Sequence, residues 1–345
     1  MHWRRRAPAR DRGEGRRRTP PLGTVAIWVA AALGAIALYQ GPHALLSAPY
    51  VPSRVRPIPF AAPTRHAFGL SGAVHVAFAL PGGPVPYPLE VRGDPAALHY
   101  QWVRLHDRSP ADSALPLVGD TLRAPDAPGF YRLELVRGDD RREIDQLTLS
   151  VLVPFSLKRG ATLDGYRLGI FPFERHSRAA DDTLMGLVRV MPADADLPIS
   201  QHLRLADFLT HDGQTTWPRF AAVRRTVVDK LELVLETLAA ERGDTARVHV
   251  EVEVHSGFRS PAYNHSNRFA PDSRHQYGDA VDVAIDADGD GRITARDVRL
   301  VSQAVDRVED AHPELAGGMG VYTSAKYAHP YVHIDTRGER VRWRG

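Results

Sequence analysis

The sequence predicts an α+β fold: a C-terminal domain in which an antiparallel sheet packs against helices, preceded by a β-sandwich and one N-terminal transmembrane helix. Three patterns support this prediction. An uncharged apolar run occupies residues 23–39, short alternating runs separated by turns fill residues 64–155, and one long amphipathic helix is followed by alternating strands after residue 200. The chain has 345 residues, which is enough for two domains of ordinary size.

The apolar run at residues 23–39 predicts a membrane anchor. A helix of this length spans roughly 25 Å, near the lower limit for crossing a bilayer. Eight arginines precede it, which predicts a basic cytoplasmic tail at residues 1–22, an anchor at residues 23–40 and export of everything downstream. A buried core helix and a cleaved signal peptide, with Leu46-Ser47-Ala48 near the cleavage site, are the alternatives.

The formal net charge of +3 is unevenly distributed. Eight arginines against two acids give residues 1–22 a charge of +6, so the rest of the chain carries −3. The basic character therefore belongs to the tail, and we expect no nucleic-acid partner, although a nucleic-acid-binding arm is the alternative for the tail. The chain has no cysteine, so any metal site must use His, Asp or Glu.

Residues 41–63 are rich in proline and predict a stiff spacer. Residues 64–155 contain several short alternating runs with Pro-Gly and Gly-Asp turns between them, which predicts an immunoglobulin-like β-sandwich. Nothing in this region is typical of a catalytic site, so we expect a spacer or a module that contacts the cell wall.

Residues 156–345 form the predicted C-terminal domain. An amphipathic helix is expected at residues 218–242, where apolar residues recur at spacings near 3.6. A strand follows at residues 249–255, with three valines on one face and Glu251, Glu253 and His255 on the other.

Three possible metal ligands project from this part of the chain. Asp282 alternates with Val281 and Val283, and His333 alternates with Val332 and Ile334, so both side chains point away from the apolar faces of their strands. His275 lies in the loop before the first of these strands. Two imidazoles and a carboxylate suit zinc and leave its fourth position for a water molecule.

The sequence around these three residues resembles the zinc D-Ala-D-Ala carboxypeptidase family. The metal-site fold of that family is shared with lysostaphin-type peptidases and the hedgehog signalling domain. The resemblance covers roughly residues 195–345. Three motifs carry it in the order of the family: Ser256-Gly257-Phe258-Arg259-Ser260-Pro261-Ala262-Tyr263-Asn264, then Ser273-x-His275-x-x-Gly278-x-Ala280-x-Asp282, then Val332-His333-Ile334-Asp335.

The resemblance implies roles for individual residues. His275, Asp282 and His333 would be the zinc ligands, and Arg259 would grip the substrate or polarise its scissile carbonyl, with a structural ion pair as the alternative. Ser273 would orient the loop or contact the substrate. Many relatives carry an acidic general base three residues before the last His, where this chain has Pro330, so His329 and Asp335 are the substitutes available for proton transfer.

Residues 286–297 fit the twelve-residue loop of an EF-hand. Acidic residues stand at positions 1, 3, 5 and 12, glycine stands at position 6, and a helix is expected at residues 295–311. We expect a structural calcium ion that stiffens the neighbouring zinc strand, and an acidic solvated turn is the alternative. The predicted ligands are Asp286, Asp288, Asp290, Arg292 through its carbonyl, Thr294 and Asp297.

The function that the resemblance implies is zinc-dependent hydrolysis of peptide bonds in bacterial peptidoglycan. The predicted partners are peptidoglycan stem peptides and the cytoplasmic membrane, and the catalytic domain is expected in the periplasm or extracytoplasmic space of a single-pass inner-membrane protein. A carboxypeptidase and a cross-link endopeptidase both fit. A non-catalytic zinc protein that binds the wall is the alternative, and a peptidase acting on envelope proteins is a third.

Overall fold

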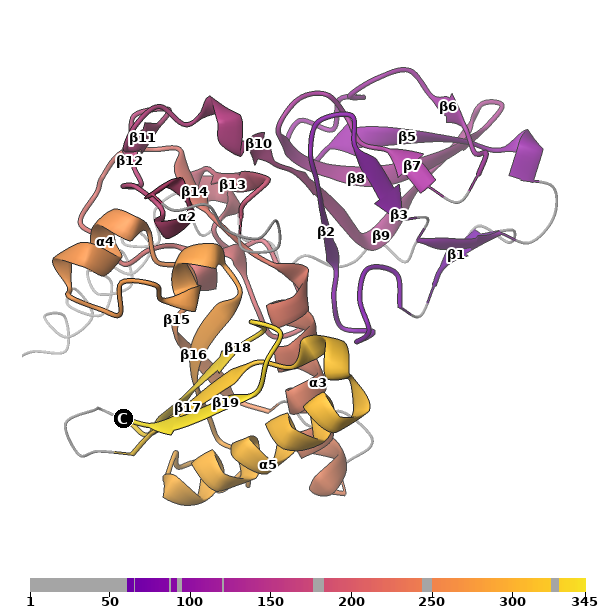
Figure 1. Cartoon of the computed structure of the whole chain (residues 1–345). Helices are drawn as coiled ribbons and strands as arrows, with labels where there is room; N and C mark the ends of the chain where they lie inside the picture. Colours follow the sequence, from indigo (N-terminus) through magenta and orange to yellow (C-terminus); the bar gives the residue numbers. More distant parts are fainter. Residues whose placement is uncertain are drawn as a thin grey trace, which may run out of the picture. The chain divides into compact units, whose positions relative to one another are not determined.

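A computed structural model describes residues 61–64, 66–86, 88–91, 95–119, 121–175, 183–243, 250–323 and 329–345. These residues all belong to one compact unit, residues 57–345 (Figure 1). The predicted tail, the anchor and nearly all of the Pro-rich spacer lie outside the described residues. Among the described helices, none is long and apolar enough to cross a membrane.

The predicted fold class is wrong. The described residues form a mixed α/β structure with several small sheets, in place of a β-sandwich joined to a helix-packed antiparallel sheet. Four α-helices occur in the described part of the chain: α2 (Pro172–Arg175), α3 (Arg225–Glu241), α4 (Pro261–Ser266) and α5 (Ala295–Ala311). Short 3-10 helices also occur: η2 (Pro95–Ala97), η3 (Phe155–Leu157), η5 (Pro192–Asp194), η6 (Leu205–Phe208), η7 (Arg274–Tyr277) and η8 (Pro313–Leu315).

The region predicted as a sandwich contains one five-stranded sheet in the order β2-β9-β8-β5-β6. Its strands are β2 (Val76–Ala79), β5 (His99–Arg104), β6 (Leu115–Pro116), β8 (Gly129–Arg137) and β9 (Asp140–Val151). β2 runs parallel to β9, so this sheet is mixed. Two small sheets accompany it: β1 (Ala61–Pro63) pairs with β4 (Leu89–Val91), and β3 (Pro84–Pro86) pairs with β7 (Thr121–Arg123). Alternating residues predict that a strand exists but not its partner or direction, which is why the prediction failed.

Two short sheets lie between this region and the C-terminal sheet along the chain. β10 (Val153–Pro154), β13 (Gly186–Val190) and β14 (Arg219–Ala221) form a three-stranded sheet. β11 (Thr162–Leu163) and β12 (Tyr166–Arg167) form a hairpin. The pairing of β14 with β13 uses residues 219–221 as a strand, so the helix predicted at residues 218–242 begins only at Arg225.

The C-terminal sheet has the order β15-β16-β18-β17-β19. Its strands are β15 (Val252–Ser256), β16 (Ala280–Ile285), β17 (Gly318–Tyr322), β18 (Tyr331–Asp335) and β19 (Val341–Arg344). β16 pairs antiparallel with both β15 and β18, but β19 runs parallel to β17, which corrects the expectation of a purely antiparallel sheet. The strands predicted around Asp282 and His333 are confirmed as β16 and β18.

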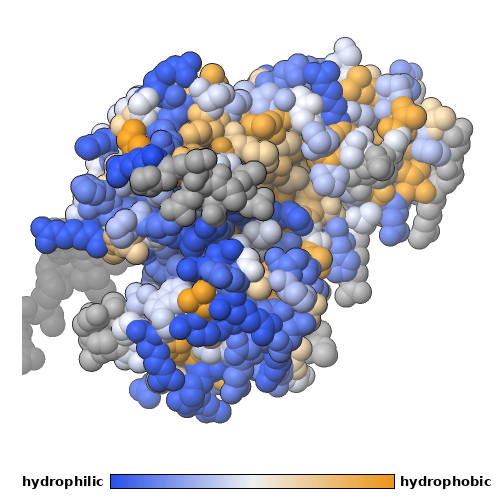
Figure 2. All heavy atoms as spheres, in the orientation of Figure 1, coloured by the Kyte–Doolittle hydropathy of each residue, from blue (hydrophilic) through white to orange (hydrophobic). Residues whose placement is uncertain are grey.

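The helices α3 and α5 run beside one another along one side of this sheet (Figure 1). The helix predicted at residues 295–311 is confirmed as α5, and its buried stripe includes Val298, Val301, Val305 and Val308. The outer surface over α5 and the end of the chain is mostly hydrophilic in Figure 2. Because the apolar stripe of α5 and the valines of β16 face the core, the polar side chains of the sheet lie on its opposite face.

A buried ion pair joins α3, α5 and β18. The Lys230 ammonium group, fully buried, donates to Glu309 Oε1 at 2.6 Å and to the backbone carbonyl of Asp335 at 2.7 Å. Glu309 is also fully buried, and its second oxygen accepts a hydrogen bond from Arg342 at 2.6 Å. Desolvation lowers the pKa of Lys230, against the raising effect of Glu309. Because every charge has a partner, this network ties both helices to the end of β18.

We predict that Lys230→Met lowers the free energy of unfolding by about 3 kcal/mol, because Glu309 would keep a buried charge without its ammonium partner. Denaturant titration of the purified protein measures this loss. Arg299→Met, at an exposed position of the same α5 helix, is the control and should change stability by less than about 0.5 kcal/mol. Equal effects of the two substitutions would contradict the role given to Lys230.

Candidate metal centre

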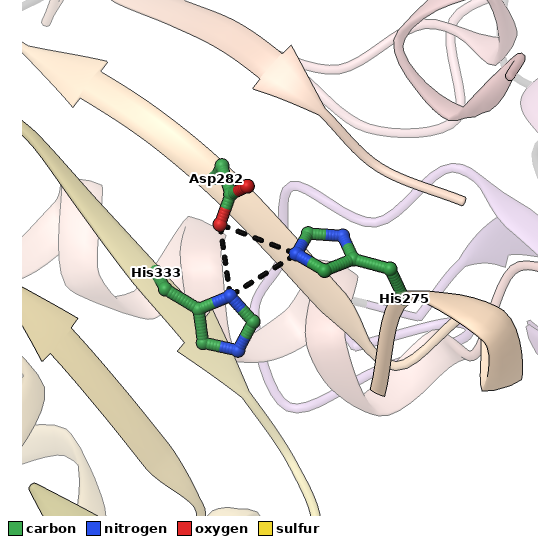
Figure 3. Close-up of side chains that lie close together, drawn as sticks. All are labelled: His275, Asp282 and His333. Carbon is green, nitrogen blue, oxygen red and sulfur yellow. Dashed lines mark hydrogen bonds and ion pairs between the residues drawn. The ribbon is translucent and has the colours of Figure 1, made fainter. Parts of the chain in front are cut away.

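The side chains of His275, Asp282 and His333 point toward one another (Figure 3). Asp282 on β16 is the direct cross-strand neighbour of His333 on β18. His275 reaches them from the loop helix η7. The three facing atoms are close: His275 Nε2 lies 3.2 Å from Asp282 Oδ1 and 3.1 Å from His333 Nδ1, which lies 2.8 Å from Asp282 Oδ1.

The other nitrogen of each imidazole is already used. His275 Nδ1 lies 2.6 Å from the carbonyl oxygen of Gly257, which can only accept, so Nδ1 carries the proton. His333 Nε2 donates to Asp335 Oδ2 at 3.1 Å. Each neutral ring therefore turns a lone pair toward Asp282 Oδ1. Three lone pairs facing one another repel unless a cation or an added proton lies between them.

The donor set fits a zinc ion. Tetrahedral zinc at about 2.0–2.1 Å from each ligand holds neighbouring ligand atoms about 3.3 Å apart, close to the three separations observed. The ordered second partners, Gly257 for His275 and Asp335 for His333, are those expected around metal-binding imidazoles. All three side chains are buried, with His275 1% exposed, Asp282 6% and His333 7%, so little water competes for them.

The pKa shifts follow from the same crowding. Desolvation lowers the pKa of His275, although Asp282 opposes this. Burial also disfavours a charged His333, but hydrogen bonds with Asp282 and Asp335 outweigh it and raise the His333 pKa. Burial alone would raise the pKa of Asp282, yet the two imidazoles bring it well below its ordinary value. Asp282 therefore remains a carboxylate, as a metal ligand must.

The loop that carries His275 is fixed by its own contacts. Arg274 pairs with Asp279 and lies over the Tyr277 ring, with its guanidinium carbon 4.5 Å from the ring centre. Gly278 closes η7 with φ of +70°, and a Cβ there would come within 2.4 Å of the carbonyl carbon of Ala222. A side chain at this position would displace the turn, so the glycine fixes the distance between His275 and β16.

Arg259 lies beside the triad. Its guanidinium pairs with Asp282 Oδ2, donates from Nε to Ser256 Oγ at 2.8 Å, and lies over the Phe269 ring at 4.5 Å. The structure thus contains the ion pair considered as the structural alternative, while a contact of Arg259 with substrate stays a prediction. Ser273 is the N-cap residue of η7, with no side-chain capping bond, and its predicted substrate contact also stays a prediction.

The two residues predicted to transfer protons lie in different surroundings. Asp335 is fully buried behind His333 and also accepts hydrogen bonds from the Gly318 amide and the Arg337 guanidinium. Burial would raise the Asp335 pKa, but His333 and Arg337 hold it well below the ordinary value. His329 is exposed, just before β18. The geometry gives Asp335 the task of orienting His333, which sequence alternation alone did not indicate.

The predicted calcium loop is partly assembled. Oxygens of Asp286, Asp288 and Asp290 lie within 4.8 Å of one another. Asp297 is used differently: its oxygens accept from the amides of Ala287 and Thr294, both at 2.9 Å or less, and from the Thr294 hydroxyl at 2.8 Å. The Arg292 amide donates to Asp290 Oδ1 at 2.8 Å. Three of the six predicted ligands are therefore brought together, and calcium binding stays a prediction.

No family model matches this chain, and no curated protein matches it. The metal centre is therefore supported by its geometry and by the motifs in the sequence.

We predict that Asp335→Asn weakens zinc binding about 10- to 100-fold, because His333 would lose the carboxylate that fixes its ring and its proton. Competition with a chromophoric zinc chelator measures the affinity of the purified protein. Asp196→Asn, at an exposed carboxylate, is the control and should bind zinc as the unmodified protein does. An unchanged affinity in Asp335→Asn would show that His333 needs no support from behind.

Proposed function

We propose that this protein is a zinc peptidase that hydrolyses peptide bonds in peptidoglycan stem peptides outside the cytoplasmic membrane. The observation that carries the proposal is the convergence of three lone pairs, from His275, Asp282 and His333, whose remaining donors and acceptors are already fixed. The order of the three sequence motifs, which resembles the zinc D-Ala-D-Ala carboxypeptidases, supports the choice of substrate.

Zinc, when bound, would polarise a water molecule and supply hydroxide near neutral pH. The protein itself would contribute two tasks. Gly257 and Asp335 accept hydrogen bonds from the protonated nitrogens of His275 and His333, which turns the other nitrogen of each ring toward the metal position. Arg259, already held by Ser256 and Asp282, keeps part of its guanidinium fork for the terminal carboxylate or scissile carbonyl of a peptide.

Both a carboxypeptidase that removes terminal D-Ala and an endopeptidase that cuts cross-links remain within this proposal. The non-catalytic alternative, in which the site binds stem peptides without cutting them, is favoured by Pro330 at the position where an acidic base is expected. The membrane anchor at residues 23–40 lies outside the described residues, so it stays a proposal.

We also propose that a calcium ion at Asp286, Asp288 and Asp290 stiffens the end of β16. Asp286 directly follows this strand, so an ion there would hold the end of the segment that carries Asp282.

The proposed activity predicts that purified protein with zinc shortens or separates muropeptides, and that His275→Ala lowers this rate at least about 100-fold. Digestion of defined pentapeptide and cross-linked muropeptides, followed by mass spectrometry, measures both reactions. His265→Ala replaces an exposed histidine of α4 and should retain full activity. Muropeptides that bind to the zinc-loaded protein but stay intact would favour the non-catalytic alternative.

Calcium removal is expected to lower the melting temperature by a few degrees and to reduce activity, while zinc content stays the same. Thermal unfolding with and without a calcium-selective chelator, alongside metal analysis, tests this. Asp286→Asn should remove the effect of the chelator, whereas Asp196→Asn should preserve it. An identical melting temperature with and without calcium would exclude the ion.

A further inference from the structure

The face of the sheet that carries the metal ligands also carries Tyr331 and His255. Tyr331 precedes His333 by two residues on β18, so both side chains project from the same face. His255 lies on β15 at an irregularity in the pairing with β16, next to Ser256, the cross-strand neighbour of Asp282. The His255 and Tyr331 rings are in contact, with 5.3 Å between their centres.

Neighbouring rings hold Tyr331 in place. Tyr322 on β17 stacks against it, with ring centres 4.5 Å apart and planes within 3° of parallel. The Tyr322 hydroxyl accepts a hydrogen bond from Trp343 Nε1 at 3.0 Å, and the Trp343 ring centre lies 5.2 Å from that of His333. Trp343 lies over Gly320, where a Cβ would come within 2.4 Å of the indole. These rings form a fixed wall from the metal ligand to His255.

His255 has the surroundings of a proton carrier. Its side chain is 26% exposed, so water and substrate can reach it, unlike the buried metal ligands. Its Nε2 lies 3.4 Å from a carboxylate oxygen of Glu253, which is itself exposed. A carboxylate at Nε2 favours the tautomer in which Nε2 carries the proton and Nδ1 is the acceptor.

Of the two groups considered for this task from the sequence, Asp335 is placed less well. Both carboxylate oxygens of Asp335 already accept hydrogen bonds, which come from His333, Arg337 and Gly318, and Asp335 is fully buried. His329 is exposed on the segment before β18. His255 combines access to solvent, a carboxylate partner and contact with a side chain of the metal face.

We propose that His255 is the catalytic proton carrier of this protein and that the Tyr331 hydroxyl is a hydrogen-bond donor to the scissile carbonyl, because Pro330 stands where an acidic base is expected. This inference rests on the proposed peptidase function. As the water oxygen bonds to the scissile carbonyl carbon, His255 Nδ1 takes one water proton, and the Tyr331 hydroxyl donates a hydrogen bond to the carbonyl oxygen as it gains negative charge.

The protonated His255 then delivers its proton to the amide nitrogen as the carbon–nitrogen bond breaks. The second water proton also passes to this nitrogen, so the products are a carboxylate and an ammonium group. The water molecule supplies every atom that is added, and no oxidant, reductant or other co-reactant is needed.

The test uses the zinc-loaded full chain and the muropeptide that the unmodified protein cleaves. His255→Ala should lower kcat about 100- to 1,000-fold and Tyr331→Phe about 100-fold, with little change in KM. Both variants should bind one zinc per chain and give the same cobalt absorption spectrum as the unmodified protein. Added imidazole should restore part of the activity of His255→Ala but none of His275→Ala. His265→Ala is the matched control.

Activity of His255→Ala within about threefold of the unmodified protein would overturn the inference and leave the peptidase intact. A loss of activity together with an altered cobalt spectrum, or without rescue by imidazole, would also overturn it, because His255 would then act through the metal site or the fold. If the unmodified zinc-loaded protein cleaves no muropeptide, the proposed function itself fails, which is a different result from the failure of His255 alone.

Discussion

The direct pairing of Asp282 with His333 across β16 and β18 is the contact on which the rest of the site depends. It places a carboxylate oxygen 2.8 Å from an imidazole nitrogen, and His275 completes the triangle from η7. A shift of one residue in this pairing would turn one of the two side chains into the core. The order of the whole C-terminal sheet therefore bears on the metal centre.

Hydrogen bonds and charge pairs behind the triad explain how two polar side chains can pair in a buried position. Asp335 holds His333 from behind, and Lys230 holds the backbone of Asp335 through a charge that Glu309 neutralises. The support thus extends from the metal face through β18 to the helices on the other side. The rings of Tyr331, Tyr322 and Trp343 lie beside the same histidine. Contacts on both sides of His333 therefore fix the orientation of its ring.

The sequence predicted the parts of the structure that depend on local periodicity. Alternation around Asp282 and His333 identified both strands and the face on which the two side chains lie, and the helix expected at residues 295–311 is α5. The three side chains of the triad could be selected because they stand at the metal-ligand positions of the motifs. Gly278 was part of the quoted motif, but its close approach to Ala222 could be seen only in three dimensions.

Features that depend on pairing between distant segments were missed. The parallel contact of β2 with β9 and of β17 with β19 has no signature in either strand, so the sandwich and the antiparallel sheet were wrongly expected. Trp343 could not be placed beside His333 for the same reason.

Anomalous diffraction at the zinc absorption edge, from crystals of the zinc-loaded protein, tests the central claim most directly. The claim predicts one strong peak about 2 Å from His275 Nε2, Asp282 Oδ1 and His333 Nδ1, with a water molecule as the fourth ligand. A strong peak elsewhere with none between these atoms, or a zinc ion whose four ligands are all protein side chains, would contradict it.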